Sequence, residues 1–137
     1  MTSDGMSPTY LRMAGSTDRC RTMSHPDGTG ENTGECGDTI RMYLKSRRDT
    51  VDEATFITDG CRHTRACANA VAELVAGVPV DAAWHIGPDT IAAFLETLPE
   101  DHYHCAELAV GALYRALQDL REGKRKPWRR LYDVDRR

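Results

Sequence analysis

Three cysteines lie at the ends of predicted secondary-structure elements. Cys36 directly precedes a predicted strand, Cys61 lies between a second strand and a helix, and Cys105 lies in the first turn of the last helix. The last two lie near helix N-termini, where the dipole and unpaired N–H groups stabilise a thiolate. Thiolates are the cysteine form that binds zinc and iron–sulfur clusters, so the pattern favours a metal site.

The spacing of these cysteines does not by itself identify the metal. The chain has no Cys-x-x-Cys pair of the kind found in zinc ribbons. Cysteines buried as small apolar side chains explain three scattered thiols about equally well. An odd total of five cysteines nevertheless indicates metal or thiol chemistry rather than a disulfide framework.

Composition excludes several classes of protein. A chain of 137 residues suits one domain with its own core. The net charge of −3 argues against a nucleic-acid binder, which usually carries a basic excess. No apolar stretch approaches the length of a membrane span, and the first residues lack the basic and apolar regions of a secretory signal. We therefore expect a cytoplasmic protein that binds neither nucleic acid nor membrane.

Two end segments are predicted to lie outside a folded domain of residues 35–123. Residues 1–34 are rich in Gly, Ser, Thr and Asp and show no apolar periodicity, which is typical of a flexible arm with a short ordered piece near Tyr10. Cys20 lies in this arm, where we expect an exposed thiol that is not a ligand. Residues 124–137 contain a cluster of Lys and Arg and are predicted to form a solvated basic tail.

The elements that position the thiols begin with two strands. Ile40, Met42 and Leu44 alternate with polar or amphipathic residues, and this period of two indicates a strand with one buried face. Residues 46–50 are polar and predict a turn, and residues 51–59 predict a second strand. Two strands so close in sequence most simply form an antiparallel hairpin.

The period then changes to that of helices. Apolar residues recur at steps of three and four from Thr64 until Gly77, and from Cys105 until Gly123, and the glycines are placed to end these helices. Shorter helices are predicted for residues 80–85 and from Pro88 onward. A hairpin followed by helices predicts an α+β domain, with helices packed on one face of a small antiparallel sheet.

Three motifs sharpen the prediction for the thiols. From about Pro26 to about Leu120, the chain resembles the U-type iron–sulfur cluster scaffolds, IscU and the N-terminal domain of NifU. The resemblance rests on the order and separation of these motifs, on Gly28-x-Gly30 before them and on the alanine-rich last helix. The motifs are Cys36-Gly37-Asp38, Asp59-Gly60-Cys61 and His104-Cys105.

The resemblance implies a shallow site built by Cys36, Asp38, Cys61, His104 and Cys105. In the family, a cysteine desulfurase delivers sulfur to these cysteines, iron joins it, and a labile [2Fe–2S] cluster passes to apo iron–sulfur proteins. It implies a scaffold rather than an enzyme, with zinc on the same ligands in isolated protein. For Asp38 a turn-forming role stays open, and so does an exposed first-turn position for His104.

The sequence departs from the family near the expected site. His63 follows the second cysteine motif, and a solvent-exposed loop position is favoured there over a ligand. Cys67 falls on the apolar helix stripe, which predicts packing in the core. His102 is expected to support the site from outside the ligand set. Residues 98–102 replace the Leu-Pro-Pro-Val-Lys segment that a dedicated chaperone reads, so the resemblance does not predict that partner.

Two other functions stay open from the residues alone. A zinc-stabilised interaction module would use the same thiols, although a chain with several apolar helices should not need a metal in order to fold. A thiol-dependent enzyme would pair Cys61 or Cys105 with a histidine base. Three clustered thiols are more than such an enzyme requires.

Overall fold

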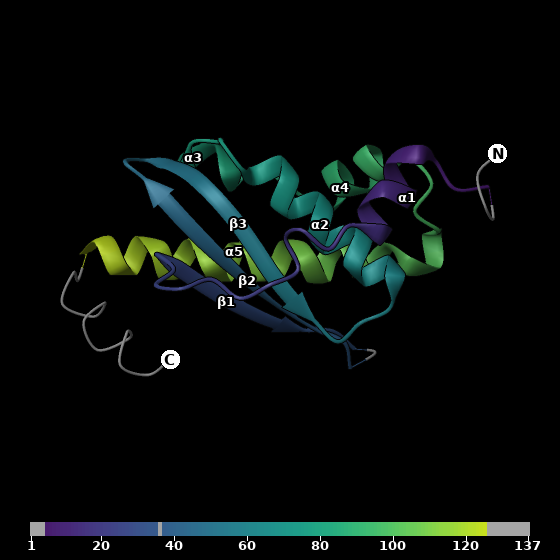
Figure 1. Ribbon diagram of the computed structural model, residues 1–137, viewed down its shortest axis with the longest axis horizontal. Helices are drawn as coiled ribbons and strands as arrows, with labels where there is room; N and C mark the ends of the chain where they lie inside the picture. Colours follow the sequence, from purple (N-terminus) through teal and green to yellow (C-terminus); the bar gives the residue numbers. More distant parts are fainter. Residues whose placement is uncertain (1–4, 36, 126–137) are drawn as a thin grey trace.

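The sheet has three antiparallel strands in the order β1-β2-β3. The structure is a computed structural model and describes residues 5–35 and 37–125 (Figure 1). The strands are β1 (Gly28–Thr33), β2 (Thr39–Arg47) and β3 (Thr50–Thr58). Since β2 pairs antiparallel with both neighbours, its first residues lie beside the last residues of β1 and of β3.

Helices cover one face of this sheet, as predicted for an α+β domain (Figure 1). The last helix lies against β1 and β2, the second helix lies against β3, and the first helix packs on the second. No helix in the described part of the chain is both long and apolar enough to cross a membrane. The helices are α1 (Pro8–Gly15), α2 (Arg62–Val75), α3 (Val80–Ala83), α4 (Pro88–Leu95) and α5 (Tyr103–Arg125), with a 3-10 turn at Glu100–His102 before α5.

The predicted hairpin is confirmed. Strands β2 and β3 pair antiparallel, and Ile40, Met42 and Leu44 are fully buried against the helices. The connection is tighter than predicted, because pairing extends to Arg47 and Thr50. Only two residues remain for the turn between them.

The predicted helices are also found, with one end corrected. Gly77 has a φ of +84° directly after the last residues of α2, so it ends that helix as expected. Gly123 was predicted to end the last helix, and this prediction was wrong. It does not take up a positive φ, and α5 continues to Arg125.

The flexible arm predicted for residues 1–34 is the main error, because residues 5–34 contain both α1 and β1. In β1 the inward positions are Gly28 and Gly30, so the strand has no apolar side chain to reveal its period. A Cβ atom at either position would lie 2.3 Å from a backbone atom of Ala116 in α5. The glycines therefore let strand and helix meet backbone to backbone.

The short ordered piece expected near Tyr10 is α1, but its helical form was not predicted, because the helix is only eight residues long. Its start carries a recognisable signal, since the Ser7 hydroxyl accepts a hydrogen bond from the Tyr10 N–H at 3.0 Å and Pro8 opens the first turn. Tyr10 is fully buried on this helix. Cys20, predicted to be exposed, is half-buried, and its backbone forms an isolated β-bridge with Phe56 of β3. Of the predicted basic tail, residues 126–137 lie outside the described residues.

Candidate metal centre

Two of the predicted thiols and a carboxylate meet around one buried hydroxyl. Thr64 Oγ1 donates a hydrogen bond to Asp38 Oδ2 at 3.0 Å and lies 3.5 Å from Cys105 Sγ and 3.9 Å from Cys61 Sγ. Thr64 is fully buried, Cys105 is almost fully buried and Cys61 is exposed. The hydroxyl thus marks the point where three separate chain segments converge.

Each group is held by the end of a secondary-structure element. Cys61 is the N-cap residue of α2, and Cys105 lies in the first turn of α5. Asp38 directly precedes β2, in a loop closed by hydrogen bonds from Gly34 N to Asp38 O at 2.9 Å and from Gly37 N to Gly34 O at 3.0 Å. Cys36, two residues before Asp38 in the sequence, lies outside the described residues, so its role stays a prediction.

Glycines allow this close approach. Gly37 has a φ of +91°, a conformation that residues with a side chain rarely adopt. At Gly60, a Cβ atom would lie 2.6 Å from the side chain of Thr64. Any larger residue at position 60 would push the hydroxyl away from the thiols. The glycines of the cysteine motifs are therefore explained by geometry.

The environment of Cys61 favours its thiolate. Partial burial, the largest single influence, raises the pKa of Cys61. Hydrogen bonds from the backbone N–H groups of Thr64 and His63, together with the contact to the Thr64 hydroxyl, lower it and outweigh burial and the nearby charge of Asp38. The net result is a pKa below that of an ordinary cysteine, on an exposed side chain.

Histidines line the other side of Cys105. Its Sγ atom lies 3.7 Å from His104 Nε2 and 4.0 Å from His102 Nδ1. The His102 ring stacks on His63, with 3.8 Å between ring centroids and 26° between planes. His63 Nδ1 is in turn hydrogen-bonded to the Tyr10 hydroxyl from α1. His63 is half-buried in this stack, so the exposed loop position favoured for it from the sequence is corrected.

Sequence reasoning missed two members of the site. Thr64 lies three residues after Cys61 on the same face of α2, a spacing that could have identified it. For Tyr10 there was no such signal, because only the packing of α1 on α2 brings it to His63. Cys67 is fully buried in the core, as predicted, and this burial raises its pKa well above that of an ordinary thiol.

The donors that converge here fit a soft or borderline metal. Thiolates suit zinc and iron–sulfur clusters, and imidazole nitrogen suits zinc and iron. The single carboxylate is a harder ligand that binds such metals less firmly. Within the described residues, Asp38, Cys61, His104 and Cys105 are the predicted ligands that the fold brings to one end of the domain.

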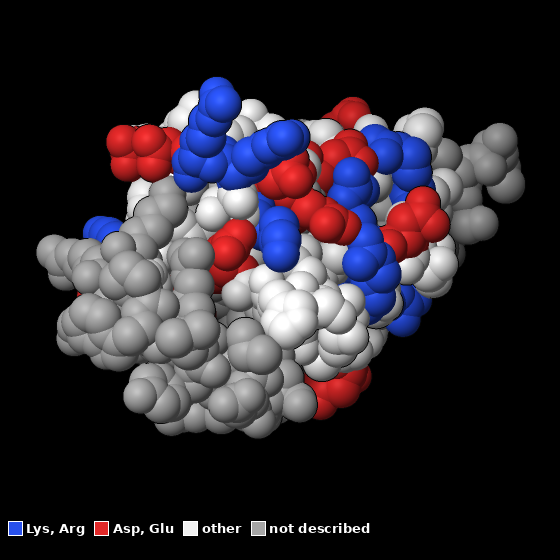
Figure 2. Space-filling model, turned by 60° about the vertical axis from the view of Figure 1, so that its left-hand side comes forward, with Lys and Arg blue, Asp and Glu red and all other residues white. Residues whose placement is uncertain are grey.

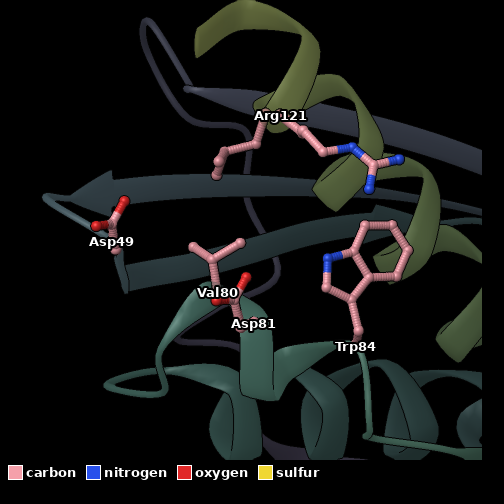
Figure 3. A pocket seen from close by; sticks show the side chains of 6 residues that line it. Asp49, Val80, Asp81, Trp84 and Arg121 are labelled. Atoms are coloured by element: carbon pink, nitrogen blue, oxygen red, sulfur yellow. The ribbon is translucent and has the colours of Figure 1, made fainter. Parts of the chain in front are cut away.

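A pocket of about 420 Å³ lies at the other end of α5 (Figure 3). Arg121 is sixteen residues beyond Cys105, which places the pocket about 24 Å away along the helix. Basic and acidic side chains are interspersed on this side of the molecule (Figure 2). The pocket lacks the convergence of thiols and imidazoles seen at the start of α5, as its lining shows: Asp49, Val80, Asp81, Trp84, Leu120 and Arg121.

The sequence is similar to proteins of known family. It matches the family described as NifU-like N terminal domain over residues 12–127. It is 33% identical over 84 residues to "Iron-sulfur cluster assembly scaffold protein IscU 1" of Archaeoglobus fulgidus, covering 61% of this chain and 55% of that protein. It is 36% identical over 87 residues to "Iron-sulfur cluster assembly protein IscU" of Plasmodium falciparum, covering 64% of this chain and 53% of that protein. The chain thus matches about half the length of these curated relatives.

Solved structures support the fold. A putative iron-sulfur cluster assembly scaffold protein from Fervidobacterium islandicum aligns with a TM-score of 0.69, at 16% identity over 81% of this chain and 95% of that chain. A NifU-like protein (N-terminal) from Brucella abortus aligns with a TM-score of 0.70, at 18% identity over 85% of this chain and 94% of that chain. Identities this low show a shared α+β fold.

Proposed function

The chain belongs to the family of NifU-like N-terminal domains, and on that premise we propose that it is a scaffold on which iron–sulfur clusters are assembled. The observation that carries the proposal is the convergence of Asp38, Cys61 and Cys105 around the Thr64 hydroxyl, within 3.9 Å of it. Relatives named as scaffold proteins support it. Thiolates from separate loops and helices are the donors that iron–sulfur clusters require.

The proposed ligands are Cys36, Asp38, Cys61 and Cys105, with His104 as a further ligand. The proposed cargo is a labile [2Fe–2S] cluster, made from iron and from sulfur that a cysteine desulfurase supplies, and passed on to apo iron–sulfur proteins in the cytoplasm. Zinc is the proposed occupant of the same ligands in isolated protein. The role is assembly and transfer without an enzymatic turnover of its own.

The two described thiols suit different steps. Cys61 is exposed and its pKa is lowered, so a sulfur donor meets an accessible thiolate. Cys105 is only 1% exposed and is shielded from solvent by its neighbours, which suits holding the cargo. Asp38 is the hard ligand of the set and is oriented by Thr64, which suits release.

One experiment separates this proposal from a zinc-stabilised module. The full chain is incubated anaerobically with ferrous iron, a sulfide source and reductant, and its visible absorption is recorded. We expect sulfur-to-iron charge-transfer bands, together with iron and sulfide bound to the protein. A colourless protein that keeps zinc and takes up no sulfide would contradict the scaffold proposal and favour a zinc-stabilised module.

A further inference from the structure

A nitrogen-rich cluster lies beside the thiol site. The ligand atoms of His102, His104 and Cys105 all lie within 4.8 Å of one another. Cys105 is buried, His102 is half-buried and His104 is exposed. Asp38 and Cys61 approach Cys105 from the other side, through Thr64. Cys105 therefore belongs to two donor sets, one rich in sulfur and oxygen and one rich in nitrogen.

The distances in the nitrogen-rich set are close to those of a metal site. A tetrahedral ion bound at zinc-like bond lengths places a sulfur and a nitrogen ligand about 3.6 Å apart. The Sγ atom of Cys105 lies 3.7 Å from His104 Nε2 and 4.0 Å from His102 Nδ1. The three ligand atoms lie within 4.8 Å of one another, so binding one ion requires the exposed His104 ring and His102 to move closer together.

The His102 ring is already oriented by its neighbours. It stacks on His63 at 3.8 Å, and His63 is fixed through Nδ1 by the hydroxyl of Tyr10. Tyr10 is fully buried on α1 and so anchors the stack to the core. Ligating histidines are commonly held in this way by groups outside the ligand set, because the ring must be oriented before the metal binds.

We propose that His102 is a metal ligand and that, with His104 and Cys105, it forms a site for one divalent transition-metal ion such as Fe²⁺ or Zn²⁺. This ion site adds a detail to the proposed scaffold function and depends on it only because both use Cys105. It needs neither Asp38 nor Cys61 and no sulfide. Imidazole and thiolate together suit the borderline divalent ions of the first transition row.

Cobalt alone is the probe. In the full chain, the background variant Cys36→Ser/Asp38→Ala/Cys61→Ser removes the other proposed ligands. We expect it to bind one Co²⁺ with a sulfur-to-cobalt charge-transfer band and tetrahedral visible bands. Adding His102→Ala should weaken Co²⁺ affinity at least about tenfold, since even the loss of an outer partner commonly costs that much. His85→Ala, at an exposed histidine elsewhere, is the matched control and should change nothing.

The unaltered chain provides a second measurement, in case the background variant fails to fold. One equivalent of diamagnetic ¹¹³Cd²⁺ should give a one-bond ¹¹³Cd–¹⁵N coupling to the ring of His102 and to that of His104, with none to His85. Unchanged Co²⁺ affinity in His102→Ala, or a bound ¹¹³Cd²⁺ without coupling to His102, would overturn the inference. Cluster assembly is scored separately, so a chain that binds Co²⁺ here but builds no cluster would refute only the proposed function.

Discussion

The two ends of α5 are built for different purposes. At its start, the Cys105 thiol contacts the hydroxyl of Thr64 and the rings of His102 and His104. Toward its other end, the Arg121 guanidinium lies 5.3 Å from the Trp84 ring (Figure 3). The same ring stacks on Tyr114 in the middle of the helix, with 5.6 Å between ring centroids. The first end presents the proposed metal ligands, whereas the second presents packing and a cation–π contact. Substitutions should therefore separate metal binding from stability along one helix.

The largest expected effect is on cluster binding at the first end. Cys61→Ser should abolish the visible absorption of the reconstituted protein, because it removes an exposed thiol that we propose as a ligand. Cys36→Ser and Cys105→Ser should do the same. Cys20→Ser is the matched control and should retain the cluster. Iron per chain and the absorption spectrum are the measurements. A colourless Cys20→Ser beside a coloured Cys61→Ser would show that the ligands are wrongly assigned.

The middle of α5 should show the largest loss of stability. In Gly30→Ala the new methyl group meets the backbone of α5 at 2.3 Å, so β1 and α5 must separate. We expect the free energy of unfolding to fall by about 3 kcal/mol, at the upper end for overpacking. Urea denaturation measures this. The control, Gly15→Ala, has open space around its Cβ position and should be close to neutral; equal losses in both variants would contradict the close-packing explanation.

Asp38→Ala should alter the lability of the cluster. Removing the hard ligand leaves the thiolates in place, so we expect a cluster that persists longer in air and transfers more slowly to an apo-ferredoxin. The measurements are the decay of visible absorbance and the anaerobic transfer rate, with the exposed Asp52→Ala as control. Faster decay in Asp38→Ala, with unchanged circular dichroism, would mean that Asp38 holds the cluster instead of promoting its release.

The far end should respond in stability alone. Trp84→Ala removes a half-buried ring together with its stacking and cation–π contacts, for which we expect a loss of about 1–2 kcal/mol in the free energy of unfolding. Arg121→Ala should lose less, since it removes only the cation. Both variants should bind as much iron as the unaltered chain. A fall in iron content without unfolding would break the separation between the two ends.

Cys67→Ala is expected to have the smallest effect. Its side chain is fully buried near the first end, but burial raises its pKa and keeps the thiol neutral. The substitution should cost about 1 kcal/mol for the small cavity it leaves, and cluster content should be retained. Iron analysis and urea denaturation are run on the same sample. Loss of iron as severe as in Cys61→Ser would identify Cys67 as a fourth thiolate ligand.

Periodicity was enough to predict the helices and strands whose buried face is made of regularly spaced apolar side chains. The β2–β3 hairpin, α2 and α5 show apolar residues at regular steps, and each was predicted near its observed position. Strand β1 carries no such signal, because its buried face consists of Gly28 and Gly30. Helix α1 is too short for periodicity, and its burial depends on α2 and α4 being in place.

The candidate site divides in the same way. Motifs bring Asp38, Cys61 and Cys105 to notice because their residue types and neighbours are distinctive. Thr64 and Tyr10 are ordinary residues in sequence, and only the packing of α2 against α5 and α1 gives them partners. A hydroxyl among thiols is therefore a feature that the fold creates.

The contact between β1 and α5 also affects when the site can form. The Thr29 N–H donates a hydrogen bond to Asp119 Oδ2 at 2.9 Å, across 90 residues of chain. The Thr64 hydroxyl contacts Asp38, which is 26 positions before it, and Cys105, which is 41 positions after it. Contacts so distant in sequence make folding slow, because the intervening chain must be ordered before they form. During synthesis, the growing chain holds Cys61 long before Cys105 exists. The complete ligand set should therefore assemble only after α5 has left the ribosome, which delays metal loading until the domain is finished.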